Sequence, residues 1–192
     1  MQNVFDDVTA MIGKTPIVRL NRIRPESGAS LYAKLEYMNP GSSIKDRIAV
    51  QMVADAEASG KLKPGGTIVE CTSGNTGMGL AMVGAVKGYR TILVMPDKVS
   101  SEKIKALRAF GARVITTPTA VAPDDPRSYY SVARRISEQA PNCFFANQYQ
   151  NESNPLAHEK TTGPEIWEQM GASLDAVFVA SGTGGTIGGI GR

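Results

Sequence analysis

Short apolar runs alternate along this chain with longer segments whose apolar residues recur every three or four positions. The apolar runs have the length of strands, and they do not alternate strictly between apolar and polar residues. Such runs are typical of strands buried on both faces of a parallel sheet. Strands are predicted at 31–35, 67–71, 91–95, 113–116, 143–146 and 176–180. Their alternation with helices favours an open, mostly parallel α/β sheet.

The predicted helices have recognisable ends. The first follows Ser43, where Asp46 gives a weak capping box, and it ends at Gly60. Another has Asp125 as its predicted N-cap and Pro126 at its first position. Three further helices are predicted at 78–87, 101–110 and 155–170, and each is followed directly by a glycine. Residues 187–192 have the sequence of the first turns of a further helix.

Composition excludes several classes of function. The 192 residues carry a net charge of +3, with the basic residues spread along the chain, so neither a nucleic-acid-binding nor a membrane-binding surface is predicted. The two cysteines, Cys71 and Cys143, are far apart and form no metal or redox motif. We therefore expect a cytoplasmic protein with no metal site, and we interpret Cys71 as a buried structural thiol.

A glycine-rich loop follows the last predicted strand. Residues 182–186 read Gly-Thr-Gly-Gly-Thr and lead into a helix, which directs several backbone amides toward one point and suits a phosphate group. The spacing is not that of a dinucleotide-binding fingerprint, because Ile187 stands where the third glycine is required, and no Gly-Lys-Ser/Thr follows as in a P-loop. A dehydrogenase is therefore disfavoured. The alternative is a glycine-rich turn without a ligand.

A second polar loop, 72–77, follows the predicted strand 67–71 and reads Thr-Ser-Gly-Asn-Thr-Gly. Its hydroxyls, its side-chain amide and its free backbone amides suit a carboxylate, and Asn75 is able to bond to a phenolic oxygen. An ordinary helix N-cap uses the same residue types, so this loop by itself favours the structural interpretation. Gln148 follows the predicted strand 143–146 at the sheet end where α/β folds bind ligands, and is a further candidate for substrate binding.

Lys45 follows a glycine-serine turn and lies in the first turn of a predicted helix. Most lysines are solvated surface charges, but a helix N-terminus disfavours an ammonium ion and lowers its pKa. A lysine that is neutral part of the time can attack an aldehyde to form an imine. The only histidine, His158, has no triad or metal cluster around it and is interpreted as a surface or structural residue, and Trp167 as a core residue.

Together these motifs resemble the fold-type II pyridoxal phosphate enzymes, the family of cysteine synthase and cystathionine β-synthase. The resemblance covers the chain from residue 12 to residue 191. The segments that carry it, in the family's order and spacing, are Ser43-Ile44-Lys45-Asp46-Arg47, the loop 72–77 and the loop 182–186. Each motif is weak alone, and the combination is highly specific.

The resemblance implies a role for each candidate residue, with pyridoxal 5′-phosphate as cofactor. Lys45 would hold the cofactor as an imine and act as the base at the substrate α-carbon. Asn75 would bond to the hydroxyl oxygen of the cofactor ring. The residues implied in binding the substrate are Thr72, Ser73, Gly74, Thr76 and Gln148. The residues implied in binding the cofactor phosphate are Gly182, Thr183, Gly184, Gly185 and Thr186.

The resemblance also implies the reaction, which is replacement of the β-substituent of L-serine or an activated serine by a thiol or sulfide. Segments 95–103, 117–130 and 147–158 are more similar to cystathionine β-synthase, in bacterial form, than to cysteine synthase. Condensation with homocysteine is therefore the first expectation. Cysteine synthesis from O-acetylserine or O-phosphoserine and sulfide is the second, and synthesis of diaminopropionate or a related amino acid from a serine ester stays open.

The expected architecture has two α/β lobes with the cofactor between them. The smaller lobe comprises residues 42–146, and the larger comprises 1–41 and 147–192. Family members continue by roughly half as much chain again, so the chain is expected to be truncated at its C-terminus. An inactive fragment that only binds a partner is the alternative from another class. The resemblance implies a homodimer.

Overall fold

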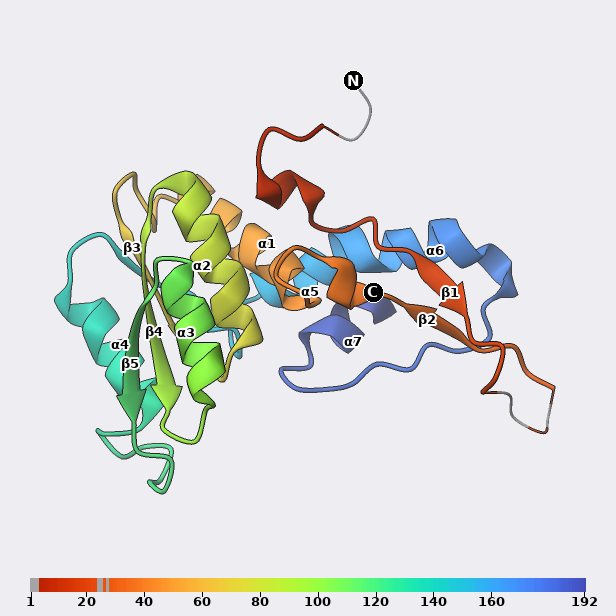
Figure 1. The fold of residues 1–192 in the computed structure, drawn as a ribbon. Helices are drawn as coiled ribbons and strands as arrows, with labels where there is room; N and C mark the ends of the chain where they lie inside the picture. The colour runs from red at the N-terminus through yellow and green to blue at the C-terminus, as the bar shows by residue number, and fades with distance from the viewer. Residues whose placement is uncertain (1–3, 24–25, 27) are drawn as a thin grey trace.

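The computed structural model describes residues 4–23, 26 and 28–192 (Figure 1). A parallel sheet with strand order β5–β4–β3–β6 forms one end of the molecule. Its strands are β3 (Thr67–Cys71), β4 (Arg90–Pro96), β5 (Arg113–Thr117) and β6 (Cys143–Phe145). Val69 of the inner strand β3 lies opposite both Ile92 and Phe145. The prediction of a parallel sheet is confirmed for these strands.

Helices cover both faces of this sheet. Helices α2 (Asn75–Lys87) and α3 (Ser101–Ala109) pack on one face, and α4 (Tyr129–Gln139) packs on the other (Figure 1). Neighbouring residues of a strand point to opposite faces. Met95 packs with Leu107 of α3, whereas Val94 packs with Ala133 of α4. Burial on both faces explains why these strands are continuous apolar runs in the sequence.

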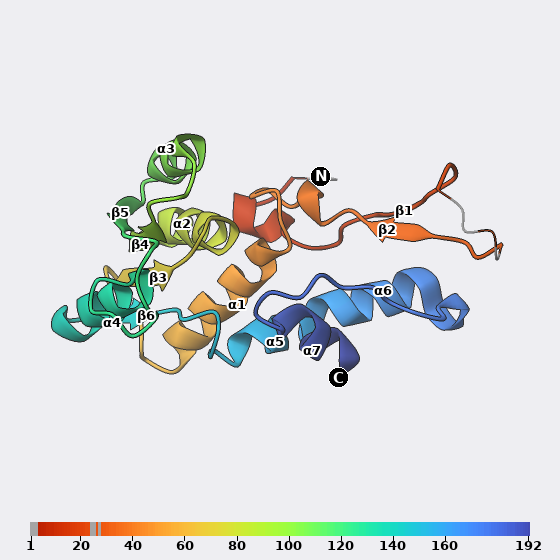
Figure 2. The same ribbon diagram turned by 90° about the horizontal axis from the view of Figure 1, so that it is seen from below.

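Helix α1 (Lys45–Ala58) connects the sheet to the rest of the molecule. It packs against α2 on one side and against α5 (Ser153–Ala157) on the other (Figure 2). The buried face of α1 is an apolar stripe, on which Ile48, Ala49, Met52 and Val53 are fully buried. This packing fixes the direction in which the first turn of α1 presents Lys45.

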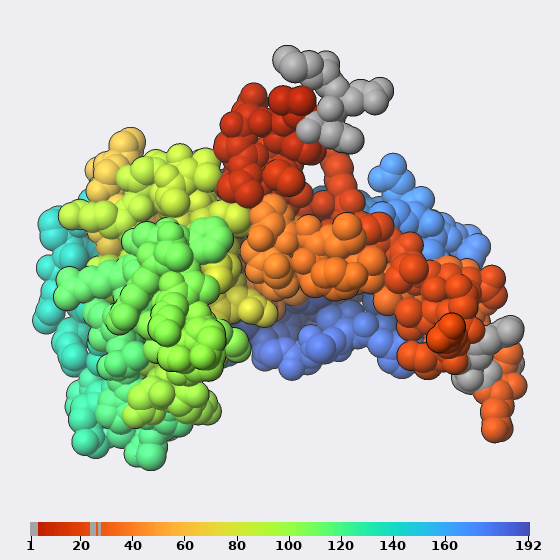
Figure 3. Space-filling view, in the orientation of Figure 1, coloured from red at the N-terminus to blue at the C-terminus, as the bar shows by residue number. Residues whose placement is uncertain are grey.

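The other end of the molecule contains the antiparallel strands β1 (Ile17–Arg19) and β2 (Tyr32–Lys34), with α6 (Gly163–Met170) and α7 (Gly185–Gly191) (Figures 1 and 2). A π-helical turn, η3 (His158–Thr162), joins α5 to α6, so the predicted helix 155–170 is confirmed with one irregular turn. Short 3₁₀ turns are η1 (Val8–Met11), η2 (Glu36–Met38) and η4 (Gly171–Ser173). Figure 3 shows the segment that precedes α1 (orange) at the front surface. The helices that cover the sheet (green) lie beside it, and the C-terminal residues (blue) lie below it. The two-lobe division at residues 42 and 146 stays a prediction.

Two predictions about apolar residues are wrong. Residues 176–180 form no strand, and Phe178 is 93% exposed. A strand needs a neighbour for its backbone hydrogen bonds, and no described strand pairs with this segment. Trp167 is exposed rather than part of the core, because it lies on the outer face of α6.

Two helix caps also differ from prediction. Ser128 caps α4, since its Oγ accepts a hydrogen bond from the Ser131 amide at 3.1 Å, while the Asp125 carboxylate binds Arg127 instead. At α1 no capping box forms. Asp46 turns back to accept from the Gly41 amide at 2.6 Å, and this contact fixes the turn that precedes Lys45.

Candidate active site

Lys45 is the first residue of α1 and is half-buried. Its backbone amide donates to Ser43 Oγ at 3.0 Å, and Ser42 before it adopts a positive φ of 61°. Such a φ is uncommon for a residue other than glycine and is concentrated at functional sites. Burial lowers the pKa of Lys45. A larger share of the amine is therefore neutral and nucleophilic than on a solvated lysine.

The loop between β3 and α2 has an inner and an outer side. Thr72 and Thr76 are buried, whereas Ser73 and Asn75 are exposed. Thr72 Oγ1 accepts from the Gly74 amide at 3.1 Å, and Gly74 has a φ of 152°. Helix α2 begins at Asn75, earlier than predicted, so this side chain projects from the first residue of the helix.

The structure joins the two loops and Gln148 through hydrogen bonds, although they are far apart in the sequence. Thr76 Oγ1 donates to Gln148 Oε1 at 2.5 Å. The carbonyl of Gln148 accepts from Asn154 Nδ2 at 2.8 Å, and the same Nδ2 donates to Thr183 Oγ1 at 2.9 Å. Asn154 is 1% exposed, so this connection is shielded from water. Sequence reasoning missed Asn154, which lies at the start of α5.

The glycine-rich loop is shaped for close approach. Gly184 has a left-handed φ of 78°, which favours glycine. Gly185 has no room for a side chain, because the Asn154 amide occupies the position of a Cβ. Thr183 Oγ1 accepts from Asn154 Nδ2 and, at 3.3 Å, from the Gly185 amide. The hydroxyl proton of Thr183 is therefore directed away from these two donors and is available to a ligand.

His158, which the sequence left as a surface or structural residue, is fully buried and structural. Its ring nitrogens lie beside the hydroxyls of Thr162 and Thr186, at 2.9 and 3.2 Å. Burial, reinforced by the charges of Lys45 and Arg47, lowers the pKa of His158 to about 4. The imidazole is therefore neutral at neutral pH, and it contacts the last residue of the glycine-rich loop.

Glu70 is a buried carboxyl group in β3, two residues before the candidate substrate loop, and sequence reasoning missed it. The residue is fully buried, and its Oε1 accepts from the Gln148 amide at 3.5 Å. Its Oε2 has no hydrogen-bond partner among the described residues. Burial raises the pKa of Glu70 to about 8, so the carboxyl group holds its proton at neutral pH. A neutral acid avoids placing a charge beside the candidate carboxylate site.

This raised pKa has a consequence for stability. The folded chain keeps a proton on Glu70 between its unfolded pKa of 4.5 and about 8, so stability falls by roughly 1.4 kcal/mol per pH unit as pH rises through that window. We expect Glu70→Gln to remove this dependence, so that its free energy of unfolding rises relative to that of the wild type from pH 5 to pH 8. Urea unfolding at several pH values measures the difference. A constant difference across this range would contradict the raised pKa.

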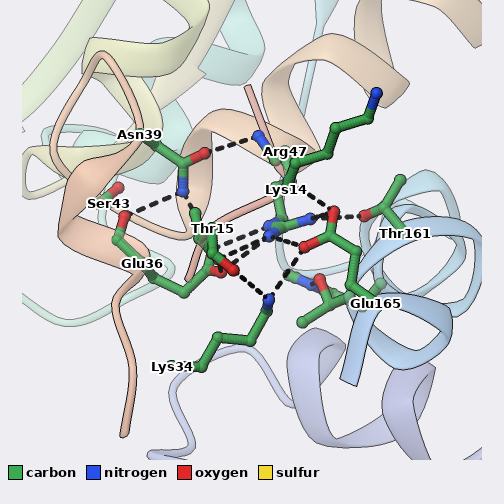
Figure 4. Close-up of polar contacts among 12 residues, drawn as sticks. Lys14, Thr15, Lys34, Glu36, Asn39, Ser43, Arg47, Thr161 and Glu165 are labelled. Atoms are coloured by element: carbon green, nitrogen blue, oxygen red, sulfur yellow. Dashed lines mark hydrogen bonds and ion pairs between the residues drawn. The ribbon is translucent and has the colours of Figure 1, made fainter. Parts of the chain in front are cut away.

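A buried cluster of charges holds the first turn of α1 (Figure 4). The Arg47 side chain is 1% exposed and lies between two carboxylates. Its Nη2 is 2.8 Å from Glu36 Oε1, and its Nη1 is 2.7 Å from Glu165 Oε1. Lys34 Nζ is 3.0 Å from Glu165 Oε2. The cluster ties the N-terminal segment and α6 to the helix that begins with Lys45.

Two grooves adjoin the candidate substrate loop. The larger, of about 730 Å³, passes Ser73 and Tyr149 and reaches Lys98 and Arg134. The smaller, of about 240 Å³, lies between Gly41, the Gly74–Asn75 turn and Lys103. Lys45 lines neither groove. The loop residues therefore face solvent on two sides.

Other chemistries find less support. Cys71 is fully buried, as expected, and burial raises the pKa of its thiol well above the ordinary range. Within the described residues, no group of three or more His, Cys, Asp or Glu side chains is placed to hold a metal ion. The helices of the described segments are all too short or too polar to cross a membrane.

The chain matches the family described as "Pyridoxal-phosphate dependent enzyme" over residues 8–192. It belongs to this family. Cystathionine beta-synthase from Apis mellifera is 50% identical over 98% of the chain, and a probable cysteine synthase from Bacillus subtilis is 48% identical over all of it. The crystal structure of O-ureido-L-serine synthase superposes with a TM-score of 0.90, at 44% identity over 98% of the chain.

The chain spans only part of these relatives. It covers 38% of the honeybee protein, 62% of the Bacillus protein and 58% of the crystallised synthase. The superposition confirms the α/β fold of the fold-type II pyridoxal phosphate enzymes, and membership of the family confirms the cofactor. The individual roles of Lys45 and of the two loops stay predictions.

Proposed function

We propose that this chain provides the lysine, the substrate loop and the phosphate loop of an enzyme that replaces the β-substituent of a serine-type amino acid. The main support for this proposal is the hydrogen-bonded connection that runs from Thr76 through Gln148 and Asn154 to Thr183. It links a loop suited to a carboxylate with a loop suited to a phosphate, as one ligand with both groups would require. Relatives named cystathionine beta-synthase and cysteine synthase support the same class of reaction.

The residues present fit pyridoxal phosphate. The Lys45 amine is half-buried with a lowered pKa, as an amine that attaches to an aldehyde needs. Thr183 has accepted protein hydrogen bonds, which leaves its hydroxyl proton for an anion. The proposed phosphate ligands are Gly182, Thr183, Gly184, Gly185 and Thr186. The proposed substrate ligands are Thr72, Ser73, Gly74, Thr76 and Gln148.

When bound, pyridoxal phosphate supplies an electron sink for negative charge at the α-carbon of an amino acid. The protein supplies position and proton transfer. Lys45 attaches the cofactor and then, as a free amine, removes the α-proton. Thr76 and Gln148 orient the substrate carboxylate, and Asn75 bonds to the ring hydroxyl oxygen. Neutral Glu70 keeps a second negative charge away from that carboxylate.

We propose L-serine or an activated serine as the first substrate and homocysteine as the thiol, which makes the reaction that of cystathionine β-synthase. Sulfide as the nucleophile, with O-acetylserine or O-phosphoserine, is the second candidate, and the relative named cysteine synthase favours it. The groove of about 730 Å³ beside Ser73 is large enough for an amino-acid thiol, which supports the first candidate. A homodimer in the cytoplasm completes the proposal.

Absorbance spectroscopy tests this function directly. The purified chain is mixed with pyridoxal phosphate, and we expect a band at the longer wavelength of a lysine-linked cofactor. Addition of L-serine or O-acetyl-L-serine should move this band, and homocysteine or sulfide should restore it with release of cystathionine or cysteine, identified by mass spectrometry. A chain that binds no cofactor would contradict the proposal and favour the alternative, a fragment that only binds a partner.

A further inference from the structure

The glycine-rich loop is connected to the turn between α5 and α6 by the imidazole of His158. Nδ1 of the ring lies 2.9 Å from Thr162 Oγ1, and Nε2 lies 3.2 Å from Thr186 Oγ1. His158 is fully buried, and Thr162 and Thr186 are 1% and 7% exposed. His158 and Thr162 are the first and last residues of the π-helical turn. Single turns of this kind occur frequently at functional sites.

The two contacts cannot have the same direction. A neutral imidazole has one N–H donor and one nitrogen acceptor. Burial lowers the pKa of His158 to about 4, so the ring is neutral when the protein is at neutral pH. One threonine hydroxyl therefore donates to the ring, and the other accepts from it. The tautomer of His158 decides which of them keeps a proton for another acceptor.

The surroundings of Thr162 decide the direction. Within the described part of the chain, each threonine hydroxyl has a ring nitrogen of His158 as its one side-chain partner. Thr162, 1% exposed, lies in the turn between α5 and α6, so its hydroxyl proton has Nδ1 as its acceptor, whereas Thr186, 7% exposed, lies in the glycine-rich loop, where a bound anion would accept its proton. The shorter of the two distances is then the one with the O–H donor, as O–H donors form shorter bonds than N–H donors. Nε2 consequently has the ring proton and donates it to Thr186.

We propose that His158 is a positioning residue for the cofactor phosphate: as the Nε2–H tautomer it donates to Thr186 and so leaves the Thr186 hydroxyl proton free for a phosphate oxygen. This inference rests on the proposed function of the loop. Thr183 is treated in the same way, since its Oγ1 accepts from Asn154 and Gly185. Asn154 and His158 thus convert both hydroxyls of the loop into donors, which an anion with several acceptor oxygens requires.

The tautomer can be measured without any cofactor. His158 is the only histidine in the sequence, so long-range ¹H–¹⁵N NMR spectra of the labelled full chain show a single imidazole. We expect a protonated Nε2 and an unprotonated Nδ1 at neutral pH. A protonated Nδ1 would overturn the inference, because the Thr186 hydroxyl would then donate its proton to Nε2 of the ring and not to a phosphate oxygen.

Binding of pyridoxamine 5′-phosphate tests the contact with phosphate. This compound has an amine in place of the aldehyde and cannot attach covalently to Lys45, and pyridoxamine lacks only the phosphate. In His158→Leu we expect about tenfold weaker binding of pyridoxamine 5′-phosphate, with pyridoxamine unchanged. His158→Gln retains an N–H donor, so binding should stay within about threefold of the wild type. Equal or tighter binding in His158→Leu would overturn the inference, since removing an acceptor would then have released the Thr186 proton.

Two neighbouring hydroxyls give a milder pair of variants in case His158→Leu does not fold. Thr162→Val removes the donor to Nδ1, so the second tautomer should appear in the NMR spectrum and phosphate-dependent binding should fall. Thr161→Val removes a hydroxyl that donates to the Ala157 carbonyl and accepts from Arg47 Nη1 at 3.2 Å without contacting His158, so it should change neither. A wild-type chain that binds both compounds equally would overturn the loop's proposed function as well. An Nδ1–H tautomer with a normal preference for phosphate would overturn the role of His158 alone.

Discussion

Lys45→Ala is expected to abolish covalent attachment of the cofactor and to lower turnover by about a thousandfold or more, because it removes both the attaching amine and the proposed base. Borohydride reduction followed by peptide mapping locates the attachment. In the wild-type chain, the peptide that contains Lys45 should gain the mass of the reduced cofactor. In Lys45→Ala, that mass should be absent while the chain stays folded, because the half-buried lysine that is removed forms no ion pair with the residues that the structure describes.

An exposed lysine provides the matched control for this experiment. Lys61 follows α1 at the surface, so Lys61→Ala should retain both the label at residue 45 and full turnover. A label that moves to another lysine in Lys45→Ala would show that proximity to the aldehyde, rather than the environment of residue 45, determines attachment. Turnover that survives in Lys45→Ala would contradict the role of this residue as base.

The sequence predicted what depends on local residues. Lys45 and the two loops could be proposed as candidates because each lies in a short motif beside an element whose period is visible in the sequence. The parallel sheet was found for the same reason. The missed residues act across long separations. Glu70 lies 78 residues before Gln148, and Arg47 lies 118 residues before Glu165. Whether such a side chain is buried and paired depends on tertiary packing, which a local pattern does not contain.

The wrong predictions have the same physical origin. Residues 176–180 have the composition of a buried strand, but a strand requires a neighbour to accept its backbone hydrogen bonds. Asp125 and Ser128 are both good N-caps, and the Arg127 side chain decided between them by binding Asp125. His158 was not linked to the glycine-rich loop, because its partner Thr186 lies 28 residues away in the sequence. In each case a single distant or competing contact determined the structure.

Arg47→Met is expected to destabilise the fold by about 3–5 kcal/mol at pH 7, since it leaves the largely buried Glu36 carboxylate without a counter-charge and leaves Glu165 with Lys34 alone. The Arg134–Glu138 pair is the control, because it has the same 2.8 Å separation, but its side chains are 66% and 60% exposed. Arg134→Met should therefore change the free energy of unfolding by less than about 1 kcal/mol. Urea unfolding of the two variants beside the wild type measures both.

The pH dependence distinguishes loss of charge pairing from loss of packing. Burial alone would raise the pKa of Glu165, but the hydrogen bonds from Arg47 and its neighbours outweigh this and lower the pKa to about 2. The stabilisation is thus present above the unfolded pKa of 4.5 and is lost as pH falls from there toward 2. The deficit of Arg47→Met should accordingly shrink as pH falls below 4.5. Adding Glu36→Gln to Arg47→Met should also recover part of it, because the cluster then keeps the Lys34–Glu165 ion pair and no unpaired carboxylate. A deficit that is independent of pH and unaffected by this substitution would mean that Arg47 holds the first turn of α1 by packing alone.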